Sequence, residues 1–325
     1  MILITGAAGY IGTELRRQLR VWGIPFIGVD NFVKPAADHR RVLEDGVVFG
    51  HTNDTQLMID LMTIHKVKAV VNLAAVVGDP ACRKYPTQAR QSILYGVNSL
   101  INAVHEVNPR IKFIQASTCS VYGFNPDEQL LTEESPVNPL SLYAELKVYA
   151  EQAIEHSRLS NTILRFATAF GLSPGAMRYD LTVNEFTRDV FLGRRIRVYR
   201  ENDWRPYTHV WDLARICMEA AWGTQLYGVY NVGDSQNNYT KKQIIEILKG
   251  WTTPDVEWVA NKDDQDQRNY RVNFERLRLH RGAGMTVHVV PGISEMIDHL
   301  KTEDPDGIQA DSQECRSDFL NCSEG

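Results

Sequence analysis

The sequence predicts an α/β protein, with a doubly wound parallel sheet in its first part and a smaller carboxyl-terminal α/β lobe. Two observations indicate this class. In the first half, short and nearly continuous apolar runs alternate with longer segments of helical periodicity, as in a parallel sheet covered by helices on both faces. In the second half this alternation becomes irregular, as expected of a lobe that contributes loops to a cleft.

Each element follows from its apolar period. Strands are expected at residues 2–5, 26–29, 69–73, 112–115 and 162–165, and helices at 10–21, 54–66, 89–107 and 140–156. In the second half, helices are expected at 180–192, 210–222 and 240–249, the last capped by Thr240, and strands at 196–199 and 229–232. The predicted division is 1–170, 171–300 and a tail at 301–325.

Charge is concentrated at the carboxyl end. Residues 301–325 hold seven acids and two bases, a sum of −5 that equals the net charge of the whole chain. The tail is therefore expected to be acidic, flexible and outside the fold, with an acidic docking peptide as the alternative. The remaining body is near neutral, so its charge makes no case for nucleic acid as a partner.

Other compositional features narrow the setting. The five cysteines are scattered and lack CxxC spacing, which argues against a disulfide framework or a metal site. The longest apolar runs are only strand-sized, so no membrane span is expected. Met1 leads straight into an apolar run without a basic region before it, so a cytosolic location is expected.

The first expected strand runs directly into the segment TGAAGYIG. Gly6 can make the tight turn, Gly9 lets the backbone approach a pyrophosphate, and Gly12 lets the helix pack closely on the strand. The helix amino terminus then offers free N–H groups and a partial positive charge to the phosphates. Strand, glycine loop and helix in this order predict a Rossmann-type dinucleotide site.

Two later segments strengthen this prediction. Asp30 follows Gly12 by 18 residues and ends the second expected strand. A carboxylate there accepts hydrogen bonds from the adenosine ribose and repels a 2′-phosphate, so it favours NAD over NADP; a solvated turn aspartate is the alternative. The segment NLAA, residues 72–75, would let the cofactor lie against the sheet edge, although tight packing alone could explain it.

Tyr143 and Lys147 stand four residues apart in SLYAELK, so both lie on one face of the expected helix. A free tyrosine is a poor base at neutral pH, because its pKa is about 10. A nearby ammonium group and a positively charged nicotinamide both favour the phenolate, which could then take the proton of a sugar hydroxyl. The hydroxyls of IQASTCSVYG, about 25 residues earlier, could complete a hydrogen-bonded triad with the substrate.

Together these segments resemble the extended short-chain dehydrogenases/reductases, and specifically the nucleotide-sugar epimerase/dehydratase family. The resemblance covers residues 1 to about 300 and rests on TGAAGYIG, Asp30, NLAA, STCSVYG, YAELK, LRFATAFG and WRPYTHVWDLA, in the family's order. It implies that Thr118 is the catalytic hydroxyl, Tyr143 the general base and Lys147 its partner. It also implies an NAD cofactor, a nucleotide-diphosphate sugar substrate and a homodimer built through helices 89–107 and 140–156.

The resemblance implies further contacts. Arg165 and Phe166 match residues near the nicotinamide, Asn184 an asparagine that orients the sugar nucleotide, and Arg205 an arginine that contacts the diphosphate. The expected cofactor residues are Gly6, Gly9, Tyr10, Ile11, Gly12, Asp30, Asn31, Leu73, Ala74, Ala75, Tyr143, Lys147 and Phe166. The expected substrate residues are Thr118, Thr168, Arg178, Asn184, Arg205 and Arg268.

Departures from the family pattern are informative. The family's 4,6-dehydratases place Asp-Glu directly after the catalytic threonine, whereas Cys119 and Ser120 stand here, which argues against dehydration. Thr168 replaces a usual asparagine, and His51 replaces an aspartate that holds adenine. The stretch ILYGVNS gives no clean match to the family's NVxGT-like helix start.

Three segments, GDPAC at 78–82, MRYDLTVNEF at 177–186 and RNYRV at 268–272, resemble a branch similar to GDP-heptose 4-dehydrogenases. On that resemblance Arg178 and Arg268 become phosphate or sugar ligands. Cys82 and His209 could carry catalytic roles, but packing is the preferred interpretation of both.

The leading hypothesis is NAD-dependent oxidation at C4 of a nucleotide-diphosphate sugar, as an epimerase or a 4-dehydrogenase in surface-polysaccharide or deoxysugar biosynthesis. A 4,6-dehydratase is one alternative. The other is a non-catalytic NAD-binding regulator, which the survival of both Tyr143 and Lys147 disfavours.

Overall fold

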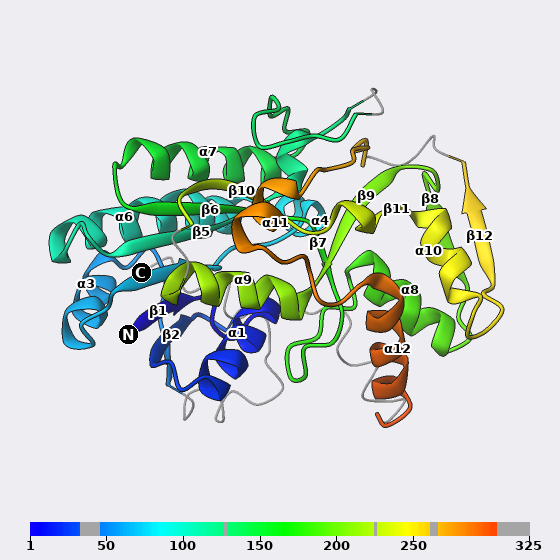
Figure 1. The fold of residues 1–325 in the computed structure, drawn as a ribbon, viewed down its shortest axis with the longest axis horizontal. Coiled ribbons are helices and arrows are strands. Elements are labelled where there is room, and N and C mark those ends of the chain that lie inside the picture. The colour runs from blue at the N-terminus through cyan, green and yellow to red at the C-terminus, as the bar shows by residue number, and fades with distance from the viewer. Residues whose placement is uncertain (33–45, 126–128, 224–225, 261–265, 304–325) are drawn as a thin grey trace.

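The computed structural model describes residues 1–32, 46–125, 129–223, 226–260 and 266–303. Its main feature is a seven-stranded sheet with the order β10-β6-β5-β4-β1-β2-β3, in which every pairing is parallel (Figure 1). The strands are β1 Ile2–Thr5, β2 Phe26–Asp30, β3 Val47–Phe49, β4 Ala69–Asn72, β5 Lys112–Thr118, β6 Asn161–Phe166 and β10 Gly228–Val232.

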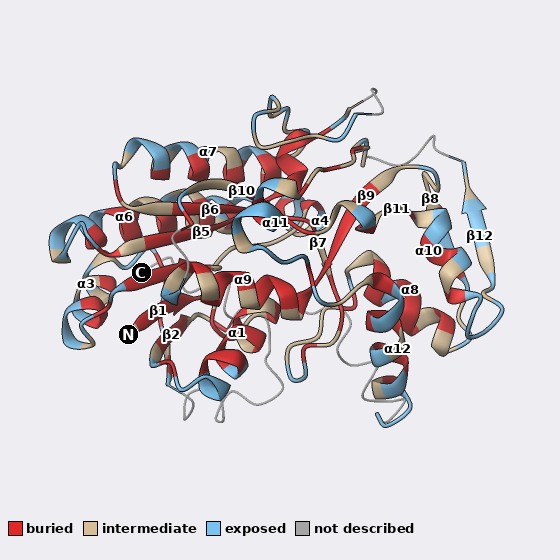
Figure 2. Ribbon diagram, viewed as in Figure 1, coloured by how far each residue is buried: buried red, intermediate tan, exposed pale blue. Residues whose placement is uncertain are grey.

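Helices cover both faces of this sheet, which confirms the doubly wound prediction (Figure 1). On one face lie α1 Tyr10–Val21, α9 Val210–Trp222 and α11 Glu275–Arg281, whose apolar side chains share a core with Ile4 and Leu164 of the sheet. On the other lie α3 Thr55–Ile64, α6 Gly96–Val107 and α7 Leu142–His156, packed on Leu3 and Val70. The strands are accordingly buried along most of their length (Figure 2).

The expected helix at 89–107 is divided into three consecutive pieces. A short helix α5, Pro86–Ala89, leads into a π-helical turn, Arg90–Tyr95, and then into α6. The strand β3 and the short helix α4, Asp79–Lys84, are among the elements of this half that were not predicted. Both are too short for a periodic apolar pattern to reveal them.

The smaller part of the molecule contains two further sheets. Strands β7 Thr168–Phe170, β9 Trp204–His209 and β11 Asn238–Thr240 form the first, and β8 Ile196–Tyr199 and β12 Val256–Val259 form the second. Helices α8 Thr182–Phe191, α10 Lys241–Leu248 and α12 Val289–Leu300 enclose a separate core that includes Phe170 and Tyr207. Thr240 caps α10 through a reciprocal capping box with Gln243, as its position predicts.

The chain does not leave the large sheet for good at residue 171. The strand at 229–232 was expected in the smaller lobe, but β10 pairs with β6 at the edge of the seven-stranded sheet, and α9 packs on α1. Residues from beyond position 170 thus complete the seven-stranded sheet and the helical layer that contains α1. The division of the chain at residue 170 stays a prediction.

Residues 304–325, most of the expected acidic tail, lie outside the described residues. None of the described helices combines the length and apolar character needed to cross a membrane. Within the described ranges, no cluster of three or more His, Cys, Asp or Glu side chains has an arrangement that could hold a metal ion.

Candidate active site

The glycine loop has the close contacts that its spacing predicts. Gly6 has a positive φ of 69°, and a Cβ there would lie 2.8 Å from the backbone nitrogen of Ala74. A Cβ on Gly12 would lie 2.2 Å from the carbonyl oxygen of Gly6. A larger residue at either position would therefore collide with backbone, which side-chain rotation cannot relieve. The loop, the start of α1 and the segment after β4 form one closely packed cradle at the carboxyl end of the sheet.

Asp30 is fixed beside this cradle. One carboxylate oxygen accepts a hydrogen bond from the Ala8 backbone N–H at 2.8 Å, and the other accepts one from Phe32 at 2.8 Å. Burial raises the pKa of Asp30 above its ordinary value, and the backbone donors lower it in part. Each oxygen keeps acceptor capacity for a second donor, so the aspartate suits the ribose hydroxyls of NAD.

Tyr10 and Asn184, both expected at the ligand, are joined to each other and to the turn after β7. The Tyr10 hydroxyl donates to the Gly171 carbonyl at 2.5 Å and accepts a bond from Asn184 at 3.2 Å. The Asn184 side chain, which is fully buried, also accepts from the Gly171 N–H and donates to the Arg178 carbonyl. The described contacts are structural, and the expected ligand contacts of both residues stay predictions.

Tyr143 and Lys147 lie one turn apart on α7, buried beneath the carboxyl end of β5. The Lys147 ammonium is 5.8 Å from the centre of the Tyr143 ring and donates to the Ala116 carbonyl at 2.9 Å. Ser141 begins the helix, because its hydroxyl accepts a bond from the Ala144 N–H at 3.3 Å. Tyr143 therefore belongs to the first turn of a capped helix.

The pKa values of this pair depend mainly on burial. Burial lowers the pKa of Lys147 to about 8 and raises the pKa of Tyr143 well above its ordinary value. Cys82 and Asp79 raise the pKa of Tyr143 further, whereas Arg178 and Arg268 lower it. In the protein without cofactor, desolvation outweighs the neighbouring charges. The expected lowering of the tyrosine pKa by Lys147 together with a bound nicotinamide stays a prediction.

Thr118 is the last residue of β5, and its hydroxyl accepts a bond from the Ser120 N–H at 3.1 Å. The Cys119 thiol is buried and turned toward β6, where it donates to the Arg165 carbonyl at 3.2 Å. The Ser120 hydroxyl instead accepts a bond from the Arg268 guanidinium at 2.8 Å. Neither position after Thr118 offers a carboxylate, as the sequence indicates.

Two expected substrate residues, Arg205 and Arg268, meet around Asp266. Arg268 contacts Asp266 through its Nε at 2.7 Å, and Arg205 contacts the same carboxylate at 3.1 Å. Burial raises the pKa of Asp266, but the two guanidiniums act more strongly and hold it well below its usual range. Arg268 reaches a second carboxylate, Asp79, at 2.9 Å. The structure thus brings two arginines together in a network that the sequence did not connect.

The remaining expected residues lie outside the pair of Tyr143 and Lys147 and outside the arginine network. Arg178 pairs with Asp180, and its charge acts on Tyr143. Phe166 packs in the core on the α1 side of the sheet. Thr168 is half-buried in β7, beside Tyr207 of β9.

Arg165 was expected beside the nicotinamide, and its described contacts include other side chains of the protein. Its guanidinium pairs with the buried Glu151 at 2.7 Å and donates to the Tyr122 hydroxyl at 3.1 Å. Alternate residues of a strand point to opposite faces, so Phe166 and Arg165 face different layers of helices. The expected contact of each with the nicotinamide stays a prediction.

The packing interpretation fits both His209 and Cys82. The His209 ring caps α9 by accepting a bond from the Trp211 N–H at 3.2 Å, and it packs edge-on against Phe170. The Cys82 thiol donates to the Val76 carbonyl at 3.2 Å, and burial raises its pKa to about 12.

Asp79 and Ser141 were not singled out from the sequence. Asp79 accepts a bond from the Ser141 hydroxyl at 2.5 Å, directly before the helix of Tyr143. The available signal was the segment GDPAC, in which glycine followed by Asp-Pro is typical of a helix start and the aspartate falls in its first turn.

A glycine cradle, an aspartate suited to the adenosine ribose and a buried tyrosine–lysine pair beside Thr118 define an NAD-dependent enzyme of the short-chain dehydrogenase/reductase class. A family comparison gives the same class more narrowly. The chain belongs to the NAD dependent epimerase/dehydratase family, whose model matches residues 2–233. Membership of this family, with the cradle and Asp30 in place, confirms NAD as the cofactor.

Several known proteins are similar to this chain. UDP-glucuronate 4-epimerase 4 of Arabidopsis thaliana is 32% identical over 67% of this chain and 53% of its own length, so the chain spans about half the length of that relative. UDP-glucose 4-epimerase of Halalkalibacterium halodurans is 29% identical over 76% of this chain and 79% of its own.

Solved structures show the same fold. UDP-glucose 4-epimerase of Thermus thermophilus, in complex with NAD, is 23% identical with a TM-score of 0.79 and covers 93% of this chain and 99% of its own. UDP-glucuronic acid 4-epimerase of Bacillus cereus, in complex with UDP-glucuronic acid and NAD, is 21% identical with a TM-score of 0.79, over 92% and 98% of the two chains.

Proposed function

We propose that this chain is an NAD-dependent 4-epimerase of a UDP sugar, with UDP-glucuronate and UDP-glucose as the first candidates. The observation that carries the proposal is the cluster of Thr118, Tyr143 and Lys147 at the carboxyl end of the sheet, next to the cofactor cradle. The 4-epimerase names of the relatives support the substrate class.

In this proposal Tyr143 takes the proton of the C4 hydroxyl, and Thr118 hydrogen-bonds the same oxygen. When bound, NAD supplies hydride acceptance and hydride return at C4. Lys147, one turn beyond Tyr143, holds α7 against β5 through the Ala116 carbonyl. Burial raises the pKa of Tyr143 in the protein without cofactor, and the positive charge of bound oxidised NAD would favour the phenolate.

Arg205 and Arg268 are proposed to hold the substrate diphosphate. A guanidinium suits phosphate oxygens because it presents parallel N–H groups. Both arginines now bind Asp266. Substrate phosphate would therefore displace the Asp266 carboxylate from these two guanidiniums, or bind to them beside it.

Dehydration is disfavoured in this proposal. A 4,6-dehydratase of the family carries Asp-Glu directly after its catalytic threonine, but here one position is a thiol turned toward β6 and the other a serine. The 4-dehydrogenase outcome uses the same triad and differs only in release of the keto-sugar. The branch similar to GDP-heptose 4-dehydrogenases stays a prediction from the sequence, because the relatives named above are enzymes of UDP sugars.

The test is incubation of the purified NAD-loaded protein with UDP-glucose, UDP-glucuronate and GDP-mannose, with products followed by NMR and mass spectrometry. The C4 epimer of a UDP sugar is the expected product. Stoichiometric NADH without an epimer would make the protein a dehydrogenase, and an 18-dalton loss would make it a dehydratase. Tyr143→Phe is expected to lower the rate roughly 10²- to 10⁴-fold with little change in NAD binding.

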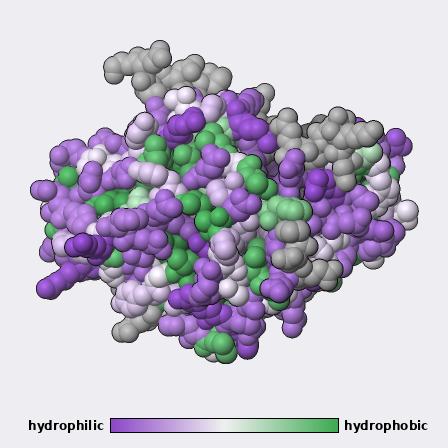
Figure 3. Space-filling view, turned by 90° about the horizontal axis from the view of Figure 1, so that it is seen from above, coloured by the Kyte–Doolittle hydropathy of each residue, from purple (hydrophilic) through white to green (hydrophobic). Residues whose placement is uncertain are grey.

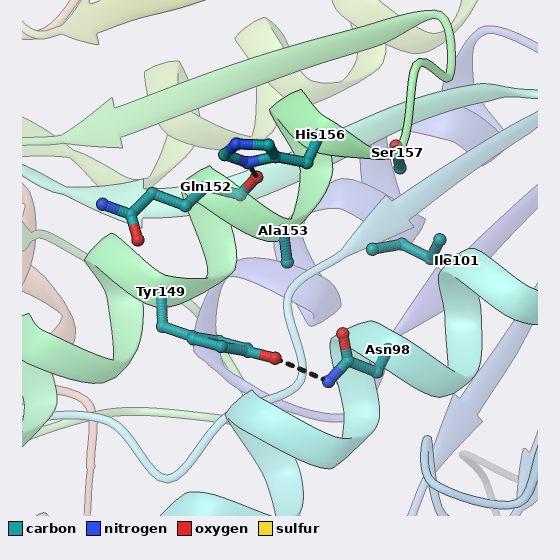
Figure 4. A pocket seen from close by; sticks show the side chains of 7 residues that line it. All are labelled: Asn98, Ile101, Tyr149, Gln152, Ala153, His156 and Ser157. Atoms are coloured by element: carbon teal, nitrogen blue, oxygen red, sulfur yellow. Dashed lines mark hydrogen bonds between the residues drawn. The ribbon is translucent and has the colours of Figure 1, made fainter.

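A homodimer through α6 and α7 is part of the proposal. A shallow hollow of about 430 Å³ lies between these helices, lined by Asn98, Ile101, Tyr149, Gln152, Ala153, His156 and Ser157 (Figure 4). Hydrophobic side chains are scattered among hydrophilic ones across the face seen in Figure 3. Two copies of this helix pair would form a four-helix interface. Sedimentation at micromolar concentration tests it, and a monomer there would contradict the dimer.

A further inference from the structure

Asp79 lies between two parts of the site that are distant in sequence. Its side chain is 7% exposed, and each of its oxygens has a different partner. One oxygen accepts a bond from the Ser141 hydroxyl at 2.5 Å, and the other contacts the Arg268 guanidinium at 2.9 Å. A short helix, the start of α7 and the segment after residue 265 therefore meet at one carboxylate.

Both partners of Asp79 lead directly to the proposed chemistry. Ser141 caps α7, and Tyr143 lies in the first turn of that helix. Arg268 donates to Ser120 at 2.8 Å, two residues after Thr118. Asp79 consequently joins the helix that carries the base to the arginine proposed for the diphosphate.

We propose that Asp79 is a positioning residue for the reaction, which fixes the first turn of α7 relative to Arg268 so that Tyr143 and the bound sugar keep one separation. This inference rests on the proposed function, because it presupposes that Tyr143 acts on a substrate held by Arg268. Neither the relatives' names nor the family description assigns a role to this aspartate.

Charge balance alone explains only part of the arrangement. Arg205 and Arg268 carry two positive charges, and Asp79 and Asp266 supply two negative ones. A buried arginine pair needs such carboxylates. Charge balance does not require the bond from Ser141, whose hydroxyl already serves as the cap of α7. The bond from Ser141 therefore makes Asp79 a link between the start of α7 and Arg268, in addition to a counterion of that arginine.

Electrostatics give this link a measurable signature. The ionisable groups that act on Tyr143 are Cys82 and Asp79 of α4, which raise its pKa, and Arg178 and Arg268, which lower it. Lys147 lies against its ring from the same helix. The Asp79 carboxylate thus opposes phenolate formation, so its contribution to the reaction is the geometry that it maintains.

The principal variant is Asp79→Asn, which keeps the side-chain shape and an acceptor for Ser141 but removes the charge. In the NAD-loaded enzyme, its kcat at the high-pH plateau is expected to fall roughly 10- to 100-fold, because catalysis is sensitive to small displacements of positioned groups. The rising limb of the pH–rate profile, which reports Tyr143, is expected to move to lower pH. Asp60→Asn, at an exposed aspartate of α3, removes the same charge elsewhere and should change neither quantity.

The second variant is Ser141→Ala, which removes the bond and retains the charge. Its plateau is expected to fall while the rising limb stays in place. Loss of the helix cap would also lower the plateau, so the substitution is repeated in the Asp79→Asn background. If Ser141 acts only as the helix cap, Ser141→Ala lowers the plateau by the same factor in wild type and in Asp79→Asn. If Ser141 acts through Asp79, that factor is smaller in Asp79→Asn.

The inference would be overturned by an Asp79→Asn profile that matches wild type, or by complete disappearance of the rising limb, which would make Asp79 the titrating group. Full additivity of the two substitutions would also overturn it. A readout without substrate separates this inference from the proposed function. In the NAD-loaded protein, absorbance at tyrosinate wavelengths, with the Tyr143→Phe spectrum subtracted, should show Tyr143 titrating at lower pH in Asp79→Asn than in wild type, even if no sugar is turned over.

Discussion

Gly12→Ala is the sharpest test of the cofactor cradle. The added Cβ would lie 2.2 Å from the Gly6 carbonyl oxygen and 2.9 Å from the Cα and carbonyl carbon of Ala7, where real Cβ contacts stay beyond 3.0 Å. Alanine favours the helix over glycine by about 1 kcal/mol. Overpacking against rigid neighbours costs about 1–3 kcal/mol, and contact with backbone points to the upper part of that range. We therefore expect a net loss of about 2 kcal/mol in the free energy of unfolding.

Gly9→Ala is the matched control. Its Cβ would lie 3.3 Å from the Gly6 carbonyl, and its φ of −75° suits alanine. The free energy of unfolding should change by less than about 0.5 kcal/mol. NAD affinity should nevertheless fall at least about tenfold, because the methyl group occupies the approach of the pyrophosphate.

Urea unfolding of the two cofactor-free variants, with calorimetric titration of NAD, measures both effects. Gly12→Ala should lose stability and NAD affinity together, whereas Gly9→Ala should lose affinity alone. Wild-type stability in Gly12→Ala would refute the packing argument, and wild-type affinity in Gly9→Ala would refute the assignment of the phosphate site.

Three further predictions follow from buried charges. Burial lowers the pKa of Lys147 to about 8 from 10.5, so the folded state releases this proton at a lower pH than the unfolded state does. The free energy of unfolding of the wild type, relative to that of Lys147→Met, should therefore rise by about 3 kcal/mol between pH 8 and 10.5, as measured by urea unfolding. Asp30→Asn should weaken NAD binding about tenfold and narrow the preference over NADP, as measured by titration of both cofactors; an unchanged preference would contradict the ribose role. Glu151→Gln should lower the free energy of unfolding by about 3 kcal/mol, because Arg165 stays buried without its partner, while KM is unchanged.

Local patterns were sufficient for many of the long amphipathic elements, but the helix α12, Val289–Leu300, was not predicted. The bounds of β1, α1, β8 and α9 match the expected ranges, since each carries its own apolar period and terminal signal. The triad of Thr118, Tyr143 and Lys147 was likewise proposed from spacing and resemblance, and its catalytic role stays a prediction. Short elements such as α4 and β3 were missed, because a single turn or three residues holds too little periodicity to detect.

Contacts between elements and residues far apart in the sequence could not be predicted in the same way. The placement of β10 beside β6 depends on which edge of the sheet is open, and not on the composition of the strand itself. The contacts of Asp266 with Arg205 and of Asp79 with Arg268 were missed because they join residues far apart in sequence. The pairing of Arg165 with Glu151 was missed because resemblance gives a position along the strand but not the partners of a side chain.

The sheet order also has a consequence for synthesis on the ribosome. Strand β6 gains its outer neighbour only when residues 228–232 have emerged, and α1 is covered only when α9 has been made. A nascent chain shorter than this exposes an unpaired strand edge and the apolar side of the helix that follows the NAD loop. Native cofactor binding should therefore begin late in translation, although the loop itself is among the first residues made.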